Sequence, residues 1–162
     1  AISATSLSGC YMVKDISTDT IWSILKTIPD PEIPEISIVD LGIIREVHYA
    51  AAAFTIIITP TYSGCPAMYF IKEEIIHNLE SQGIMNYQIE TSLAPPWTTD
   101  WMSNAVKAKL KDAGIAPPSS NIICPQCNSR KIEVISDFGS TACKALYKCN
   151  QCNEPFHHFK QI

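Results

Sequence analysis

Cys65 stands where a strand, a glycine-containing loop and a helix are expected to meet. Residues 54–58 are mostly apolar and rich in isoleucine, which favours a strand, and an apolar stripe at helical spacing follows Pro66. Proline suits the first position of a helix, so we expect Cys65 at or near the N-cap, where the helix dipole favours a thiolate. Gly64 allows a tight turn before it. The pattern indicates either a working thiol or a buried structural cysteine, with equal weight.

Four of the seven cysteines form two Cys-x-x-Cys pairs in the C-terminal part of the chain. Two residues between ligands let both sulfurs of a pair bind one ion, and four thiolates at tetrahedral corners suit zinc. An iron site or a pair of redox dithiols is the alternative. Since four thiolates leave no open position, we expect the ion to hold the fold and take no part in chemistry. The predicted ligands are Cys124, Cys127, Cys149 and Cys152.

Three other residues near these pairs could also bind metal. Cys143 has small and apolar neighbours, which favours a small buried hydrophobic residue over a ligand. His157 and His158 could replace a ligand, but four thiolates make that unnecessary. Two Glu-x-x-His strings, at 74–77 and 154–157, are half-motifs of a di-iron site. Such a site needs further glutamates on a four-helix bundle, which the sequence does not predict.

The elements that would position these residues predict an α+β fold. A helix should begin at Ser17 and end before Pro29, and Ser17 is a good N-cap. The next segment, 29–34, contains three prolines, so it should be a stiff loop that presents Asp30 and Glu32. From composition alone, a solvated connector is the favoured interpretation of that loop. Periodicity then predicts a hairpin at 43–49 and 54–59, a helix at 66–80, a strand at 87–93, and a helix capped at 97–101 that runs to about 113.

The chain is expected to divide into four segments. Residues 1–16 lack periodicity and should form a loose arm, and residues 17–115 hold the elements just described. The composition of 116–121, rich in proline and serine, is typical of a linker. Residues 122–162 then contain the cysteine pairs and strand-like pieces near 131–136, 142–148 and 156–160. We therefore expect a small α+β domain followed by a zinc ribbon.

Charge and hydropathy exclude several classes of protein. The net charge is −4 over 162 residues, so there is no overall basic footprint for nucleic acid. The charge is uneven, at −6 for residues 1–118 and +2 for residues 119–162. The longest apolar run, 50–58, is far shorter than a membrane span, and the N-terminus lacks the pattern of a signal peptide. With paired cysteines that suit metal, these features indicate a reducing, cytoplasmic location.

Several motifs in combination resemble a known family, the PaaD/SufT-like iron–sulfur assembly domain. The resemblance lies in Asp-Pro-Glu-Ile-Pro at 30–34, Asp-Leu-Gly-Ile at 40–43, and Thr-Pro-Thr leading to Gly-Cys-Pro at 59–66. Other segments are similar to the PaaD group within it, encoded with the bacterial phenylacetyl-CoA epoxidase: 97–102, 138–147, both cysteine pairs and 154–156. The resemblance covers about residues 17–162. Relatives often carry a penultimate Cys, where this chain has Gln161, so the resemblance gives the tail no metal role.

The resemblance implies a non-catalytic accessory subunit of phenylacetate degradation. Catalysis in that system belongs to a di-iron oxygenase subunit, fed by a flavin and iron–sulfur reductase subunit. Cys65 would be the working thiol and a transient ligand of iron or an iron–sulfur cluster, beside a structural zinc. The implied partners are the oxygenase and reductase subunits, with a homodimer left open. The residues expected to border Cys65 are Asp30, Glu32, Asp40, Thr59, Thr61 and Gly64.

Two other classes of function remain open at this stage. The first is a thiol redox protein that uses Cys65, which would need a resolving cysteine, and none lies near it in sequence. The second is a zinc ribbon that binds nucleic acid, for which a charge of +2 over 119–162 is small. Thiol mapping under mild oxidation and a salt-dependent binding assay would identify them.

Overall fold

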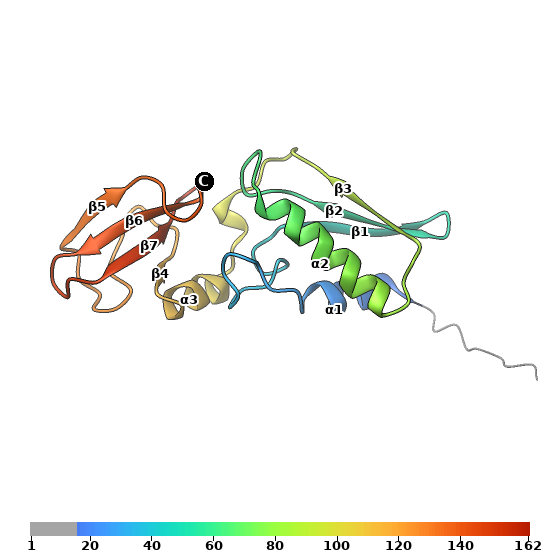
Figure 1. The fold of residues 1–162 in the computed structure, drawn as a ribbon, viewed down its shortest axis with the longest axis horizontal. Coiled ribbons are helices and arrows are strands. Elements are labelled where there is room, and N and C mark those ends of the chain that lie inside the picture. The colour runs from blue at the N-terminus through green and yellow to red at the C-terminus, as the bar shows by residue number, and fades with distance from the viewer. Residues whose placement is uncertain (1–15) are drawn as a thin grey trace, which may run out of the picture.

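The computed structural model describes residues 16–162, and the chain folds around two β-sheets (Figure 1). Nearly all of the arm expected at 1–16, with Cys10, lies outside the described residues. The first sheet has the strand order β1-β2-β3, and the second has the order β4-β7-β6-β5. Helices α1 and α2 cover one face of the first sheet, and α3 leads toward the second (Figure 1). No helix in residues 16–162 is long and apolar enough to cross a bilayer.

The first helix and the hairpin form much as the sequence predicts. Helix α1 spans Thr18–Leu25, and the N–H of Thr20 donates to the Ser17 hydroxyl at the N-cap. Strands β1 (Ile44–Ala50) and β2 (Ala53–Ile58) pair antiparallel. The turn between them places Ala51 and Ala52 at positive φ, 49° and 62°. Alanine rarely adopts this conformation, and the usual Asn-Gly or Asp-Gly is absent, so the sequence carries no ordinary hairpin signal.

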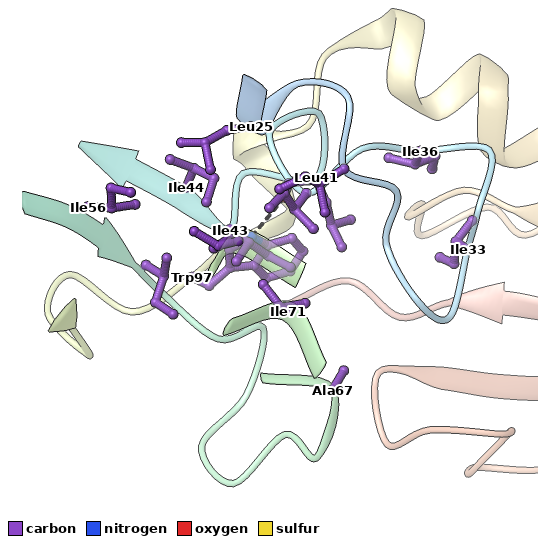
Figure 2. Close-up of a cluster of buried hydrophobic side chains, with 14 of the residues drawn as sticks. Leu25, Ile33, Ile36, Leu41, Ile43, Ile44, Ile56, Ala67, Ile71 and Trp97 are labelled. Atoms are coloured by element: carbon purple, nitrogen blue, oxygen red, sulfur yellow. Dashed lines mark hydrogen bonds between the residues drawn. The ribbon is translucent and has the colours of Figure 1, made fainter. Parts of the chain in front are cut away.

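The second helix joins two parallel strands. Helix α2 spans Ala67–Ser81, and β3 (Tyr87–Thr91) pairs parallel with β2. The buried stripe of α2 packs on the sheet, as expected from its helical spacing. Figure 2 shows how side chains from α1, the sheet, α2 and the connecting loops meet in one core, whose labelled members include Leu25, Ile44, Ile56, Ile71 and Trp97. This core fixes the start of α2 relative to the loops that precede β1.

The third helix differs from the expectation. Residues 97–101 were predicted to cap one continuous helix, but Thr99–Trp101 form a separate 3₁₀ turn, η1. The backbone of Met102 is extended (φ −75°, ψ 124°), and the buried side chains of Trp97 and Met102 anchor this segment to the core. Helix α3 then starts afresh at Asn104–Asp112, where the Ser103 hydroxyl accepts the N–H of Val106. Burial of two large side chains overrides the local helical signal here.

The second sheet is built from four short strands: β4 (Ile115–Ala116), β5 (Ile132–Ser136), β6 (Lys144–Cys149) and β7 (Pro155–Phe159). The antiparallel pairs β5–β6 and β6–β7 follow the expected strand pieces. Strand β4 pairs parallel with β7, so Ala116, which composition assigns to a linker, lies in this sheet. We call β4 to β7 and their connecting loops the ribbon.

The ribbon packs directly against the core of the first sheet. Cys143 and Phe159 belong to the same buried cluster as the residues of α1 and α2. The ring of Phe159 lies 5.9 Å from that of Trp97, centroid to centroid. The C-terminal carbonyl of Ile162 accepts the N–H of Thr99 at 3.0 Å. The two sheets therefore share buried surface, and residues from both contribute to one site.

Candidate metal centre and thiol site

The four paired cysteines converge on one point at the tip of the ribbon. The Sγ atoms of Cys124, Cys127, Cys149 and Cys152 all lie within 4.8 Å of one another. The Sγ–Sγ distances are 3.7 Å for Cys124–Cys152 and 3.5 Å for Cys127–Cys149. Four sulfurs at about 2.3 Å from a tetrahedral zinc ion are separated by about 3.8 Å, so these distances fit zinc. The donor set of four thiolates fits the same ion.

The two knuckles share one backbone geometry. In each, the chain turns back through an asparagine at positive φ, Asn128 at 59° and Asn153 at 62°. Their N–H groups donate to the carbonyls of Cys124 and Cys149 at 2.9 and 2.8 Å. Asparagine tolerates this conformation better than most residues, so these turns are encoded locally. Within residues 16–162, the one group of three or more possible metal ligands consists of these four cysteines.

Cys65 lies in the loop between β2 and α2, directly before the helix. Its carbonyl accepts the N–H of Met68 at 3.2 Å, and its own N–H donates to the Tyr62 carbonyl at 3.3 Å. The N-cap of α2 is Pro66, whose side chain makes no capping hydrogen bond. The thiol is half-buried. The sequence thus placed Cys65 correctly at the helix N-terminus, one residue before the cap.

A small cavity of about 20 Å³ separates this loop from the ribbon. That volume holds one occupant the size of a water molecule. One wall comes from the loop at 29–34, which we call the acidic loop, and from the loop that holds Cys65. The opposite wall comes from the segment of the ribbon before β6. The polar lining residues are Asp30, Glu32, Thr61, Cys65, Thr141, Cys143 and Lys144. Three of the six residues expected to border Cys65 therefore line the same cavity as its thiol.

Asp30 is buried, which corrects the interpretation of its loop as a solvated connector. Its Oδ1 atom accepts the N–H groups of Glu32 at 2.9 Å and Ile33 at 3.0 Å. Burial raises the pKa of this carboxyl above its usual value, and the two hydrogen bonds oppose that shift. The backbone of Asp30 is tied to Ile36, whose side chain is fully buried. The prolines stiffen the loop, and Asp30 and its apolar residues fasten it to the core.

Replacing Asp30 with Ala is expected to lower the free energy of unfolding by about 1–3 kcal/mol, because the buried N–H of Ile33 and the part-buried N–H of Glu32 lose their acceptor. Asp30→Asn keeps a carbonyl oxygen at the same place and should cost less. Chemical denaturation monitored by circular dichroism measures both changes. Asp19→Ala, at an exposed acid in the first turn of α1, is the control and should change little. Equal losses for the Ala and Asn variants would contradict the capping role.

Lys144 connects the ribbon to the acidic loop. Its side chain is 4% exposed, and its Nζ atom lies 3.4 Å from the Glu32 carboxylate. A buried ammonium group needs a partner, and Glu32 supplies it from the other side of the cavity. This ion pair holds the acidic loop against the start of β6.

The remaining residues expected near Cys65 lie elsewhere or differ in role. Asp40 does not line the cavity, and its carboxylate pairs with Lys109 of α3 at 2.6 Å. Thr59 is buried and lines a neighbouring cavity of about 290 Å³, together with Thr61 and Trp97. Gly64 has a φ of +81°, so its role is the turn before Cys65. The thiol site is thus built from fewer of the motif residues than the sequence suggests.

Cys143 lines the site although the sequence did not indicate it, and Tyr62 lies beside Cys65. Cys143 is buried, as expected, but it lines the cavity with Cys65. Burial raises the pKa of its thiol, Thr141 and Lys144 lower it, and Cys65 raises it. Burial, followed by the proximity of Cys65, raises the pKa of Tyr62. No spacing rule connects positions 65 and 143, so only the tertiary structure brings the two thiols together.

Two family descriptions match the two halves of this arrangement. The family described as an iron–sulfur cluster assembly protein matches residues 18–83, which include the acidic loop, the hairpin and Cys65. The family described as the PaaD zinc beta ribbon domain matches residues 112–160, which include all four clustered cysteines. The fold and its two sites thus define an iron–sulfur cluster assembly domain joined to a zinc ribbon.

Individual relatives agree with this class. A protein of Escherichia coli (strain K12), named as the D subunit of a "Putative 1,2-phenylacetyl-CoA epoxidase", is 44% identical over 88% of this chain and 92% of its own length. A Porphyromonas gingivalis (strain ATCC BAA-308 / W83) protein named Fe-S protein maturation auxiliary factor is 36% identical over 57% of this chain and 89% of its own length. The chain therefore belongs to the family of 1,2-phenylacetyl-CoA epoxidase D subunits.

Solved structures share the fold of the first domain. A domain of unknown function from Bacillus anthracis, DUF59, superimposes with a TM-score of 0.52 at 25% identity, covering 57% of this chain and 89% of its own. A conserved hypothetical protein from Thermotoga maritima gives a TM-score of 0.52 at 24% identity, covering 61% of this chain and 98% of its own. Both similarities concern the fold of the assembly domain.

Proposed function

We propose that this protein is a non-catalytic accessory subunit of the phenylacetyl-CoA epoxidase system in aerobic phenylacetate degradation. Through Cys65, it assists the assembly of an iron or iron–sulfur centre in the oxygenase or reductase subunit, in the cytoplasm. The names of its relatives support both parts of this proposal, an epoxidase subunit in one case and a maturation factor in the other. The four-cysteine centre holds the ribbon in place.

The observation that carries the proposal is the placement of Cys65. The thiol is half-exposed at the N-terminus of α2, which carries no side-chain cap. The sulfur is therefore accessible to an incoming ion, and cysteine binds iron through its sulfur as a thiolate. Buried Asp30 and the Lys144–Glu32 pair fix the loops around it. A single half-exposed cysteine holds iron only transiently, which suits delivery to a client rather than storage.

Co-purification tests the proposal. We expect the tagged protein to retain the client subunit from cells that express the whole epoxidase system, and the client from cells lacking this protein to contain substoichiometric iron. Metal analysis of each separated subunit measures this. The other subunit is the internal control, because its iron content should not depend on the protein. Full iron occupancy of both subunits in its absence would overturn the proposed function.

A further inference from the structure

The cavity between the assembly domain and the ribbon brings together two thiols that lie far apart in the sequence. Cys65 reaches it from the start of α2, and Cys143 reaches it from the segment before β6. The two differ in exposure, since Cys65 is half-exposed and Cys143 is buried. A site with one buried and one accessible sulfur is open to solvent on the Cys65 side.

We propose that Cys65 and Cys143 together bind one soft divalent metal ion between the assembly domain and the ribbon. Thiolates select soft and borderline ions such as Fe²⁺, Co²⁺ and Zn²⁺. The cavity volume of about 20 Å³ fits one ion and no cluster. The inference rests on the proposed function for the identity of the physiological ion, which would be the iron delivered to the client.

The groups around the cavity suit a cation held by two thiolates. When the ion binds, each thiol loses its proton to solvent, and the divalent charge balances the two thiolates. The Thr141 hydroxyl lies 3.1 Å from the sulfur of Cys143, where it can donate a hydrogen bond to the thiolate. Lys144 does not repel the ion strongly, because its charge is already paired with Glu32. The buried Asp30 carboxyl adds a further acidic group to the wall.

The number of ligands makes this site weaker than the zinc centre. Within residues 16–162, only the four ribbon cysteines bring three or more ligand atoms within 4.8 Å of one another. Two thiolates therefore leave coordination positions for water, and on the accessible Cys65 side for ligands from a client. An ion held in this way is ordered but remains exchangeable. The ribbon would then contribute a ligand to the site as well as a zinc-stabilised fold.

Titration with Co²⁺ tests this proposal. The full-length protein, with zinc in the ribbon, is titrated without oxygen, and the sulfur-to-cobalt charge-transfer absorption is recorded together with the zinc content. We expect one Co²⁺ per chain, full retention of zinc, and release of protons. Cys65→Ser and Cys143→Ser should each weaken binding at least about tenfold, as expected for loss of a metal ligand or its support. Cys10→Ser removes a thiol from the N-terminal segment and should bind as the unmodified protein does.

A second measurement needs no variant and so does not depend on folding of Cys143→Ser. Bound Co²⁺ should protect Cys65 and Cys143 together from alkylation, as read from the two peptides by mass spectrometry. Protection of Cys65 alone, absence of charge-transfer absorption, or uptake of Co²⁺ only by displacement of zinc would each overturn the inference. The same alkylation experiment in the presence of an oxidant would reveal a Cys65–Cys143 disulfide. If this disulfide forms and Co²⁺ does not bind, the site is a redox pair of thiols and the proposed metal site is wrong.

Two outcomes separate this inference from the proposed function. If Cys143→Ser binds Co²⁺ normally and Cys65→Ser does not, the two-thiol site is wrong and the role of Cys65 stands. If both variants lose Co²⁺ while the epoxidase in cells keeps its full iron content, the metal site stands and the maturation role is wrong.

Discussion

Cells that carry the Cys65→Ser variant of this protein are expected to fail to grow on phenylacetate, and their epoxidase activity should fall at least about tenfold. Loss of a group that holds or positions a metal typically costs about 10–100-fold in affinity or activity. The serine hydroxyl has nearly the shape of the thiol but stays protonated at neutral pH, so it is a poor ligand for iron. The measurements are the growth rate and the iron content of the client subunit.

The variant should retain its fold, which separates loss of chemistry from loss of structure. Cys65 is half-buried, and its backbone N–H and carbonyl both make hydrogen bonds. Serine preserves these, so we expect a change in unfolding free energy within about 1 kcal/mol. Ser63→Ala, at an exposed position in the same loop, is the matched control and should support normal growth. Normal growth of Cys65→Ser at normal expression would show that this thiol is structural.

Local features were predictable from the sequence because local physics determines them. The Ser17 cap, the apolar stripe of α2 and the Cys-x-x-Cys knuckles each depend on residues only a few positions apart. The turn at Ala51 and Ala52 was not predictable, because alanine has no preference for positive φ and the strands on either side impose it. The break between η1 and α3 was missed for a related reason, since burial of Trp97 and Met102 overrides helical periodicity.

The thiol site was predictable only in part, because its two walls come from different domains. The position of Cys65 directly before a helix was predicted from its strand, loop and helix, all of which are adjacent in sequence. Asp30 looked like part of a solvated loop, and its burial depends on contacts that composition does not reveal. Cys143 and Lys144 reach the cavity only because the ribbon packs on the assembly domain. The sequence predicted Cys143 as a small buried hydrophobic residue, since nothing local distinguishes a buried thiol in a cavity wall from one in a core.

Removal of zinc is expected to unfold the ribbon. Its hydrophobic cluster is small, with Ala116, Cys124, Cys149 and Phe156 as the buried members, and two of these four are themselves ligands. So small a core cannot offset the conformational entropy of the ribbon, and binding of structural zinc supplies the missing free energy. Cys149→Ser should have the same effect as a chelator. Hydrogen exchange measured by mass spectrometry should show loss of protection across β5, β6 and β7.

The unfolding should also reach the assembly domain, because the ribbon contributes to its core. Phe159 is 1% exposed and packs against Trp97, so its release should cost the assembly domain about 1.5–3 kcal/mol. Chemical denaturation should therefore show a weakened but cooperative transition for α1, α2 and the first sheet. Asn150→Ala changes an exposed residue between two ligands and should keep both zinc and stability. Zinc-free protein whose ribbon amides remain protected would show that the metal is dispensable for the fold.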